Sequence, residues 1–155
     1  MTRVERWAVV GSTALVGATG VAYALVRYLP RPPDPADPLA VSHPWEPVLL
    51  KLHVATAPLF VFALGLVFLR HIWAHWRRGL ETGRRSGLAG VVTAAAMIVT
   101  GYALQVLAQP SWIRWTGWGH TAVGGAYLVL FALHWRATRR TRSVQRTTVG
   151  PLPRP

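Results

Sequence analysis

The sequence predicts an all-α integral membrane protein, a four-helix bundle with both termini in the cytoplasm. Three observations predict this fold class. The 155-residue chain is 52% hydrophobic and only 14% charged. Four of its windows lack Asp, Glu, Lys and Arg, and each approaches the roughly 20 apolar residues that cross a bilayer core. The positive charges are concentrated between and after these windows. Because the windows have no polar face, soluble core helices are a poor alternative.

The four apolar windows define the expected elements. We expect spans at about residues 7–27, 48–76, 86–108 and 116–136. The first window also resembles a cleavable signal peptide, because Arg3 and Arg6 precede its apolar run. That run is longer than a usual signal core, so we expect a retained helix. Residues 1–137 then form the transmembrane domain, and residues 138–155 form a basic cytoplasmic tail that we expect to be disordered.

The distribution of positive charge predicts the orientation, because Lys and Arg are enriched on the cytoplasmic side of membranes. Residues 70–85 carry five Arg against one Glu, and the segment after residue 135 carries Arg and no acid. The connections before the second and fourth spans have little net charge, which places them outside. Tryptophans favour membrane interfaces and fit this frame. The outer set is Trp45, Trp112, Trp115 and Trp118, and the inner set is Trp7, Trp73, Trp76 and Trp135.

The net charge of +12 and the lack of cysteine restrict the function. Disulfides, thiolate metal sites, iron–sulfur ligation and covalent c-type haem attachment are excluded. Nucleic-acid binding is a poor alternative, because the arginines flank spans or lie in the tail and no stacking platform accompanies them. The excess of Lys and Arg is therefore interpreted as the signal that sets the orientation of the spans in the membrane.

The histidines are the candidate functional residues, since ionisable groups inside a membrane are functional candidates by default. Of the six, His53, His71 and His75 belong to the second span, and His120 and His134 belong to the fourth. The sixth, His43, lies in the outer connection, where we expect it to be solvated. The first and third spans contain no histidine.

Helix geometry predicts how these histidines pair. His120 and His134 are about 21 Å apart along a helix axis and differ by only about 40° in direction. His53 and His71 are about 27 Å apart with almost no net rotation. Both helices run from outside to inside, so His53 can face His120 at the outer level and His71 can face His134 at the inner one. His75 would lie about 33 Å from His53 and is the alternative inner ligand.

Two facing imidazoles at each of two depths match the needs of two stacked six-coordinate haems, with His53, His120, His71 and His134 as the iron ligands. A macrocycle between helices also needs clearance. Glycines leave such space, and the candidates are Gly65, Gly101, Gly124 and Gly125. We expect the glycines of the first span, Gly11, Gly17 and Gly20, to serve ordinary helix packing.

The segments "GHTAVGGAYLVLFALHW" and "KLHVATAPLF…LRHIWAHW" resemble the small four-helix, membrane-embedded dihaem b-type cytochromes of respiratory hydrogenases, formate dehydrogenases and related enzymes. The resemblance covers roughly residues 48–136. It implies two haem b groups and electron transfer between the quinone pool and a redox partner on the extracytoplasmic face, in a bacterial-type inner membrane. Several such families take one ligand from the first helix. This chain has no histidine there, so all four ligands fall on the second and fourth spans.

Two other functions remain open. One is a haem-free membrane subunit that anchors or assembles a larger complex. The other is a metal or proton pathway through the same histidines, which is disfavoured because no acid lies within a span. Gln105 and Gln109 either bind a quinone head group or cap a helix, and we favour the cap. No catalytic acid, base or nucleophile is visible in the spans, which favours an electron-transfer subunit over a stand-alone enzyme.

Overall fold

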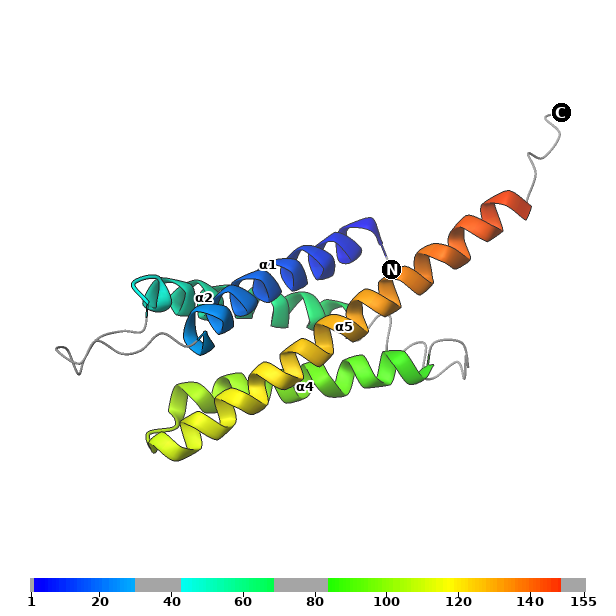
Figure 1. The fold of residues 1–155 in the computed structure, drawn as a ribbon. Coiled ribbons are helices and arrows are strands. Elements are labelled where there is room, and N and C mark those ends of the chain that lie inside the picture. Colours follow the sequence, from blue (N-terminus) through cyan, green and yellow to red (C-terminus); the bar gives the residue numbers. More distant parts are fainter. Residues whose placement is uncertain (1, 30–42, 69–83, 149–155) are drawn as a thin grey trace, which may run out of the picture. The chain divides into compact units, whose positions relative to one another are not determined.

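The chain folds into long helices (Figure 1). The structure is a computed structural model, and it describes residues 2–29, 43–68 and 84–148. The helices are α1 (Arg3–Tyr28), α2 (Glu46–Val67), α4 (Arg84–Val106) and α5 (Pro110–Thr148). The all-α prediction is confirmed. The predicted inner end of the second span, with His71 and His75, lies outside the described residues.

The chain divides into two compact units, residues 1–80 and residues 81–155. In the first unit α1 packs against α2, and in the second α4 packs against α5. Each pair is an antiparallel helical hairpin (Figure 1). Residues 107–109 alone connect α4 to α5, and so short a connection makes consecutive helices antiparallel neighbours.

Local sequence explains where the helices of the first hairpin begin. Thr2 and Glu5 form a capping box, with Glu5 N donating to Thr2 Oγ1 at 3.2 Å and Thr2 N donating to Glu5 Oε2 at 2.9 Å. α2 begins with Glu46 and a proline, an acid and an imino acid that both suit a first helical turn. Pro58 lies inside α2 and removes one backbone hydrogen bond there.

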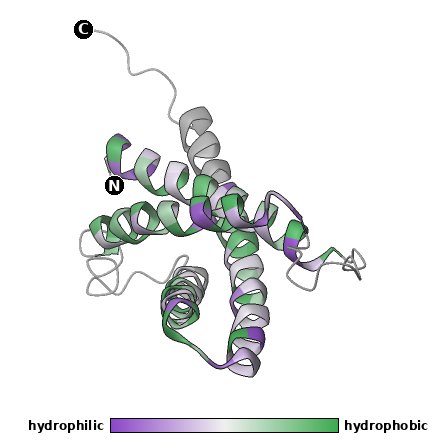
Figure 2. Ribbon diagram, turned by 90° about the vertical axis from the view of Figure 1, so that its left-hand side faces the viewer, coloured by the Kyte–Doolittle hydropathy of each residue, from purple (hydrophilic) through white to green (hydrophobic). Residues whose placement is uncertain are grey.

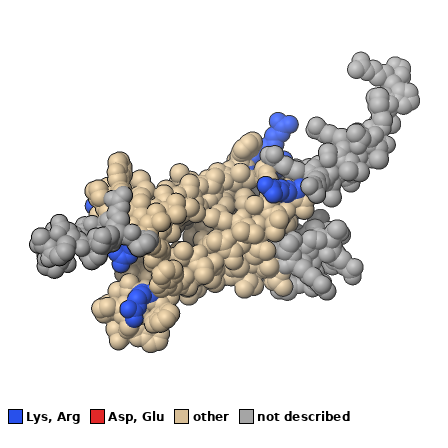
Figure 3. Space-filling view, in the orientation of Figure 1, with Lys and Arg blue, Asp and Glu red and all other residues tan. Residues whose placement is uncertain are grey.

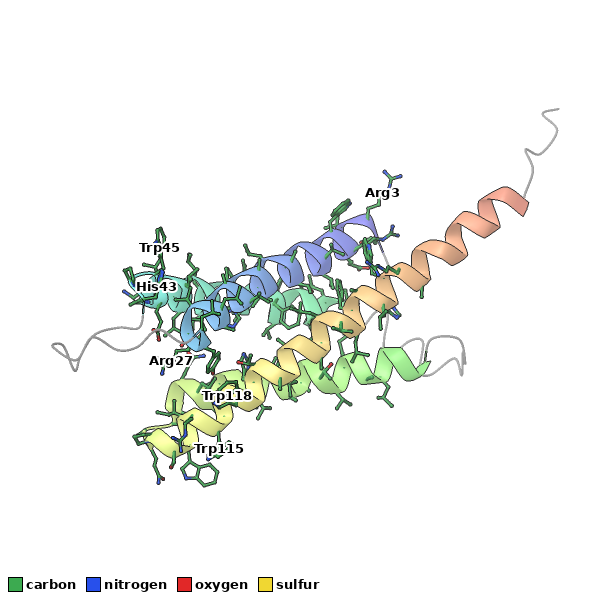
Figure 4. The ribbon with its side chains drawn as sticks, viewed as in Figure 1. Arg3, Arg27, His43, Trp45, Trp115 and Trp118 are labelled. Atoms are coloured by element: carbon green, nitrogen blue, oxygen red, sulfur yellow. The ribbon has the colours of Figure 1, made fainter. Side chains whose placement is uncertain are left out.

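An ion pair joins the two helices of the first hairpin at its connected end. Arg27 Nη1 lies 2.6 Å from Glu46 Oε1. Glu46 is buried, and its second carboxylate oxygen has no hydrogen-bond partner within the described residues. In Figure 4 Arg27 lies at the same end of this hairpin as His43 and Trp45, and Arg3 lies at the other end. Among the described residues, Arg27 is therefore the cation that balances the charge of the buried carboxylate.

The buried core of each hairpin is narrow, and most apolar side chains face outward. In the first hairpin the buried residues at helical spacing are Val9, Thr13 and Val16 of α1 and Phe60, Ala63 and Val67 of α2. In the second hairpin Ala94 and Tyr127 are buried. Large exposed side chains include Leu25, Phe62, Leu66, Val92, Val99 and Leu133. Figure 2 shows hydrophobic residues along the helices, well beyond these buried positions. Such a surface suits lipid contact.

Three of the helices are long and apolar enough to cross a membrane: α1, α2 and residues 87–106 of α4. The space-filling view in Figure 3 agrees, since its Lys and Arg atoms lie toward helix ends with uncharged surface between them. α5 is less apolar on average, because its continuation beyond residue 135 is rich in arginine and because tryptophans, glycines and two histidines interrupt its aliphatic run. The fourth span, the closure into one bundle and the cytoplasmic placement of both termini stay predictions.

α5 is longer than the sequence predicted. It continues to Thr148, whereas the fourth span was expected to end at residue 136 and to be followed by a disordered tail. Residues 138–148 contain neither Pro nor Gly, so no helix-breaking residue interrupts the arginine-rich continuation. Residues 138–148 are therefore helical, whereas a disordered tail was expected there. The rest of that tail, residues 149–155, lies outside the described residues.

Thr13→Val should stabilise the first hairpin. The Thr13 hydroxyl is buried without a hydrogen-bond partner in the described residues, and valine has the same shape without the polar atom. We expect a gain of roughly 1 kcal/mol in the free energy of unfolding, measured by thermal unfolding of the full chain in detergent. Thr13→Ser keeps the hydroxyl and loses the methyl group, so it should be less stable than the native chain. A lower melting temperature for Thr13→Val would contradict the prediction.

Candidate functional site

His53 lies in the seam of the first hairpin. It comes two turns into α2, and its half-buried imidazole faces α1. Nδ1 lies 3.1 Å from the carbonyl oxygen of Val16 and 3.3 Å from Thr19 Oγ1. A methyl group added at Gly20 would lie 2.8 Å from Cε1 and 3.1 Å from Nδ1 of His53. The ring therefore occupies the space that the absent side chain of Gly20 leaves open.

His120 has the same type of environment in the second hairpin. Its half-buried ring, near the start of α5, faces α4, where Nδ1 lies 2.9 Å from Thr100 Oγ1. A methyl group added at Gly101 would lie 3.2 Å from Cε1 and 3.8 Å from Nδ1 of His120. In both hairpins, a histidine of the second helix thus contacts a Thr-Gly pair on the first helix.

This repeated contact gives Gly20 and Gly101 a different role from the one that the sequence predicts. Gly101 was expected to leave clearance for a macrocycle, but the space beside it holds the His120 ring. Gly20 was assigned to ordinary helix packing, and the group that packs on it is the imidazole of His53. The available signal was the recurrence of Thr-Gly in the first and third spans, at residues 19–20 and 100–101.

The other predicted site residues are less closely enclosed. His134 is exposed on α5, next to Trp135, whose ring stacks on Phe131. The nearest group to a methyl added at Gly124 would be Met97 Cε, at 3.9 Å. A methyl added at Gly65 or Gly125 would meet none of the described residues within 4 Å. Both of these glycines are exposed, so added side chains there have open space.

Two other polar residues, His43 before α2 and Gln105 near the end of α4, make local contacts. The backbone N–H of Trp45 donates to His43 Nδ1 at 3.1 Å, and that of Glu46 donates to the His43 carbonyl at 2.9 Å. His43 therefore shapes the start of α2. The Gln105 amide donates to the carbonyl of Gly101 at 3.4 Å, within its own helix. This contact lies within α4, and the choice between a helix cap and a quinone head group stays a prediction.

The donor set of His53 and His120 is compatible with axial ligation of haem iron. In the described residues no three His, Cys, Asp or Glu side chains come together. Haem iron needs only one imidazole from each side, because the porphyrin supplies the other nitrogens. Metal-bound histidines almost always make a hydrogen bond through their second ring nitrogen. His53 and His120 both engage Nδ1 with a neighbouring helix, so their donor set fits axial ligation.

Comparison of the chain with protein-family models, with curated proteins and with solved structures finds no match.

Proposed function

We propose that the chain is a membrane-embedded dihaem b-type cytochrome subunit of a larger complex, which transfers electrons across a membrane between the quinone pool and a redox partner protein. One observation carries the proposal. His53 and His120, on two separate helices, are each held through Nδ1 by a neighbouring helix and lie against a glycine. Imidazoles oriented in this way within apolar surroundings suit axial ligation of haem iron.

The ligand assignment follows the predicted depths. His53 and His120 hold the outer haem, and His134 with His71 holds the inner one, with His75 as the alternative to His71. Bound haem b supplies one-electron chemistry through its iron. The chain's own residues orient the ligands and keep the surroundings apolar. The proposed membrane is a bacterial-type cytoplasmic membrane, with the partner docked on the extracytoplasmic face.

A haem-free anchoring or assembly subunit is the second candidate function. A specific observation favours it, because the hydrogen bonds of His53 and His120 already join α1 to α2 and α4 to α5. In that case the histidines stabilise two hairpins, and the exposed apolar faces bind lipid and other subunits. The two functions differ in one measurable quantity, the haem content.

Haem stoichiometry of the purified full chain tests the proposal. A pyridine haemochrome assay should find two b-type haems per chain, and His53→Ala or His120→Ala should each remove one bis-imidazole signal. Because both residues are assigned to one iron, the double variant should lose only that same signal. His43→Ala is the matched control and should keep both haems, since His43 shapes a helix start.

Other outcomes would decide against parts of the assignment. A native chain without b-type haem would refute the proposal and leave the anchoring function. Loss of both signals in the double variant, with one lost in each single variant, would show that His53 and His120 ligate different haems.

The inner site is tested by a separate pair of substitutions. His134→Ala should remove one haem signal. His71→Ala should remove the same signal, and His75→Ala should leave it intact, because His71 matches the predicted depth better. The reverse result would move the ligand one helical turn to His75.

A further inference from the structure

The hydroxyl of Thr100 fixes the position of the proton on His120. Thr100 Oγ1 lies 2.7 Å from the carbonyl oxygen of Ala96 and 2.9 Å from His120 Nδ1. A hydroxyl has one proton, and a carbonyl oxygen only accepts hydrogen bonds. The short contact therefore takes the threonine proton toward Ala96. Thr100 Oγ1 then accepts a hydrogen bond from His120, which places the imidazole proton on Nδ1.

The first hairpin leads to the same tautomer through different atoms. His53 Nδ1 lies 3.1 Å from the carbonyl oxygen of Val16, an acceptor only, so Nδ1 donates to it. Thr19 Oγ1 lies 2.9 Å from the carbonyl oxygen of Leu15 and 3.0 Å from that of Val16. The hydroxyl proton of Thr19 is therefore directed toward these two carbonyls of its own helix. Thr19 Oγ1 also lies 3.3 Å from His53 Nδ1, so it is a second and more distant acceptor for the Nδ1 proton.

Glycine contacts fix which edge of each ring faces the neighbouring helix. At Gly20 the added methyl would be nearer to Cε1 and Nδ1 of His53 than to Nε2, which would lie 3.6 Å away. At Gly101 the ring atoms of His120 within 4 Å would be Cε1 and Nδ1. Rotating either ring by half a turn would put a carbon in place of Nδ1 and remove its hydrogen bond. Tautomer and orientation are thus fixed together.

We infer that Thr100 and Thr19 are positioning residues that make Nε2 the iron-binding nitrogen of His120 and His53; this inference rests on the proposed function. In a neutral imidazole protonated at Nδ1, Nε2 carries the lone pair. An acceptor at Nδ1 also increases the basicity of the ligand, which favours the oxidised iron. Thr100 contributes more than Thr19, because its contact is shorter and because Val16 also supports His53.

The test compares three variants of the full-length chain, with the reduction potentials of both haems followed by spectroelectrochemical titration. Thr100→Val keeps the shape and removes the hydroxyl, so the outer haem should shift to a more positive potential. Thr100→Ser should restore the native value. Thr93→Val is the matched control, because Thr93 makes the same contacts to the carbonyls of its own helix, at 2.8 and 3.1 Å, and contacts none of the histidines that the structure describes.

Thr19→Val should shift the outer haem in the same direction by a smaller amount. Loss of the outer haem in Thr100→Val with full occupancy in Thr93→Val would also support the inference. Unchanged potentials in Thr100→Val would overturn it, and so would an equal shift in Thr93→Val.

A second measurement separates this inference from the proposed function. The ¹⁵N chemical shifts of the imidazoles in the labelled full chain, in detergent at about pH 8 where histidine is neutral, report the tautomer with or without haem. Protonation of His120 and His53 at Nδ1 would support the inference, and protonation at Nε2 would overturn it. A chain that contains no haem but shows Nδ1–H at both residues would refute the proposed function and the role of Nε2 in binding iron, and would support only the positioning of the tautomer by Thr100 and Thr19.

Discussion

Gly20→Ala should displace the imidazole of His53 and remove the signal of the proposed outer haem. The new methyl group would lie 2.8 Å from Cε1, closer than real side chains approach, and Val16 holds the ring from the same side. The ring must therefore move away and lose its hydrogen bond to the carbonyl. Overpacking of this kind costs typically about 1–3 kcal/mol. The measurements are haem content and thermal unfolding of the full chain in detergent.

Gly11→Ala is the matched control, because Gly11 lies on the same helix and a methyl there would meet none of the described residues within 4 Å. Alanine is favoured over glycine in a helix interior by about 1 kcal/mol, so this variant should be as stable as the native chain or more stable. Gly101→Ala should have a milder effect than Gly20→Ala, because its contact with His120 would be 3.2 Å. Gly90→Ala is the control in α4. Equal haem content and stability in Gly20→Ala and Gly11→Ala would contradict the prediction.

Much of the fold could be predicted from the sequence, because apolar windows report directly on helices in a membrane. The observed α1 and α4 contain or closely match the expected windows, and α2 begins two residues before its window. The limit of α5 was missed at its C-terminal end. There the positive charge was interpreted as a disordered tail, although nothing in residues 138–148 breaks a helix.

The candidate site was predictable as a set of histidines but not in its contacts. The spacing of His120 and His134 defines a common face of α5, but spacing within one helix cannot say which other helix covers it. In the structure His120 meets Thr100 and Gly101 of the preceding helix, while His134 is exposed. The predicted pairing of His53 with His120 across the two units stays a prediction.

The role of Gly20 and Gly101 was hidden for a related reason. A glycine is recognisable as a place without a side chain, but the group that fills the space depends on the register of the two helices. That register comes from packing between helices, which no single window of sequence contains. Thr-Gly occurs in the first and third spans, but it also occurs at residues 82–83 and 116–117, so the dipeptide alone does not identify the positions that contact a histidine.

Arg27→Met should destabilise the first hairpin strongly, although it removes a side chain that is half exposed. The carboxylate of Glu46 is 9% exposed, its Oε1 lies 2.6 Å from Arg27, and its Oε2 has no hydrogen-bond partner within the described residues. Removing one member of a buried pair leaves an uncompensated buried charge, which costs roughly 3–5 kcal/mol when both members are buried. Since Arg27 is 51% exposed, we expect a smaller loss, about 2 kcal/mol, by thermal unfolding in detergent.

The double variant Arg27→Met/Glu46→Leu distinguishes this cause from a general loss of charge. Replacing both members of a buried pair with apolar residues is often neutral, so the double variant should recover most of the stability lost in Arg27→Met. Arg3→Met is the matched control, because Arg3 lies at the opposite end of α1 (Figure 4) and should tolerate the change. A double variant no more stable than Arg27→Met would show that the arginine acts through its packing instead. Equal melting temperatures for Arg27→Met and Arg3→Met would show that the ion pair contributes nothing to the hairpin.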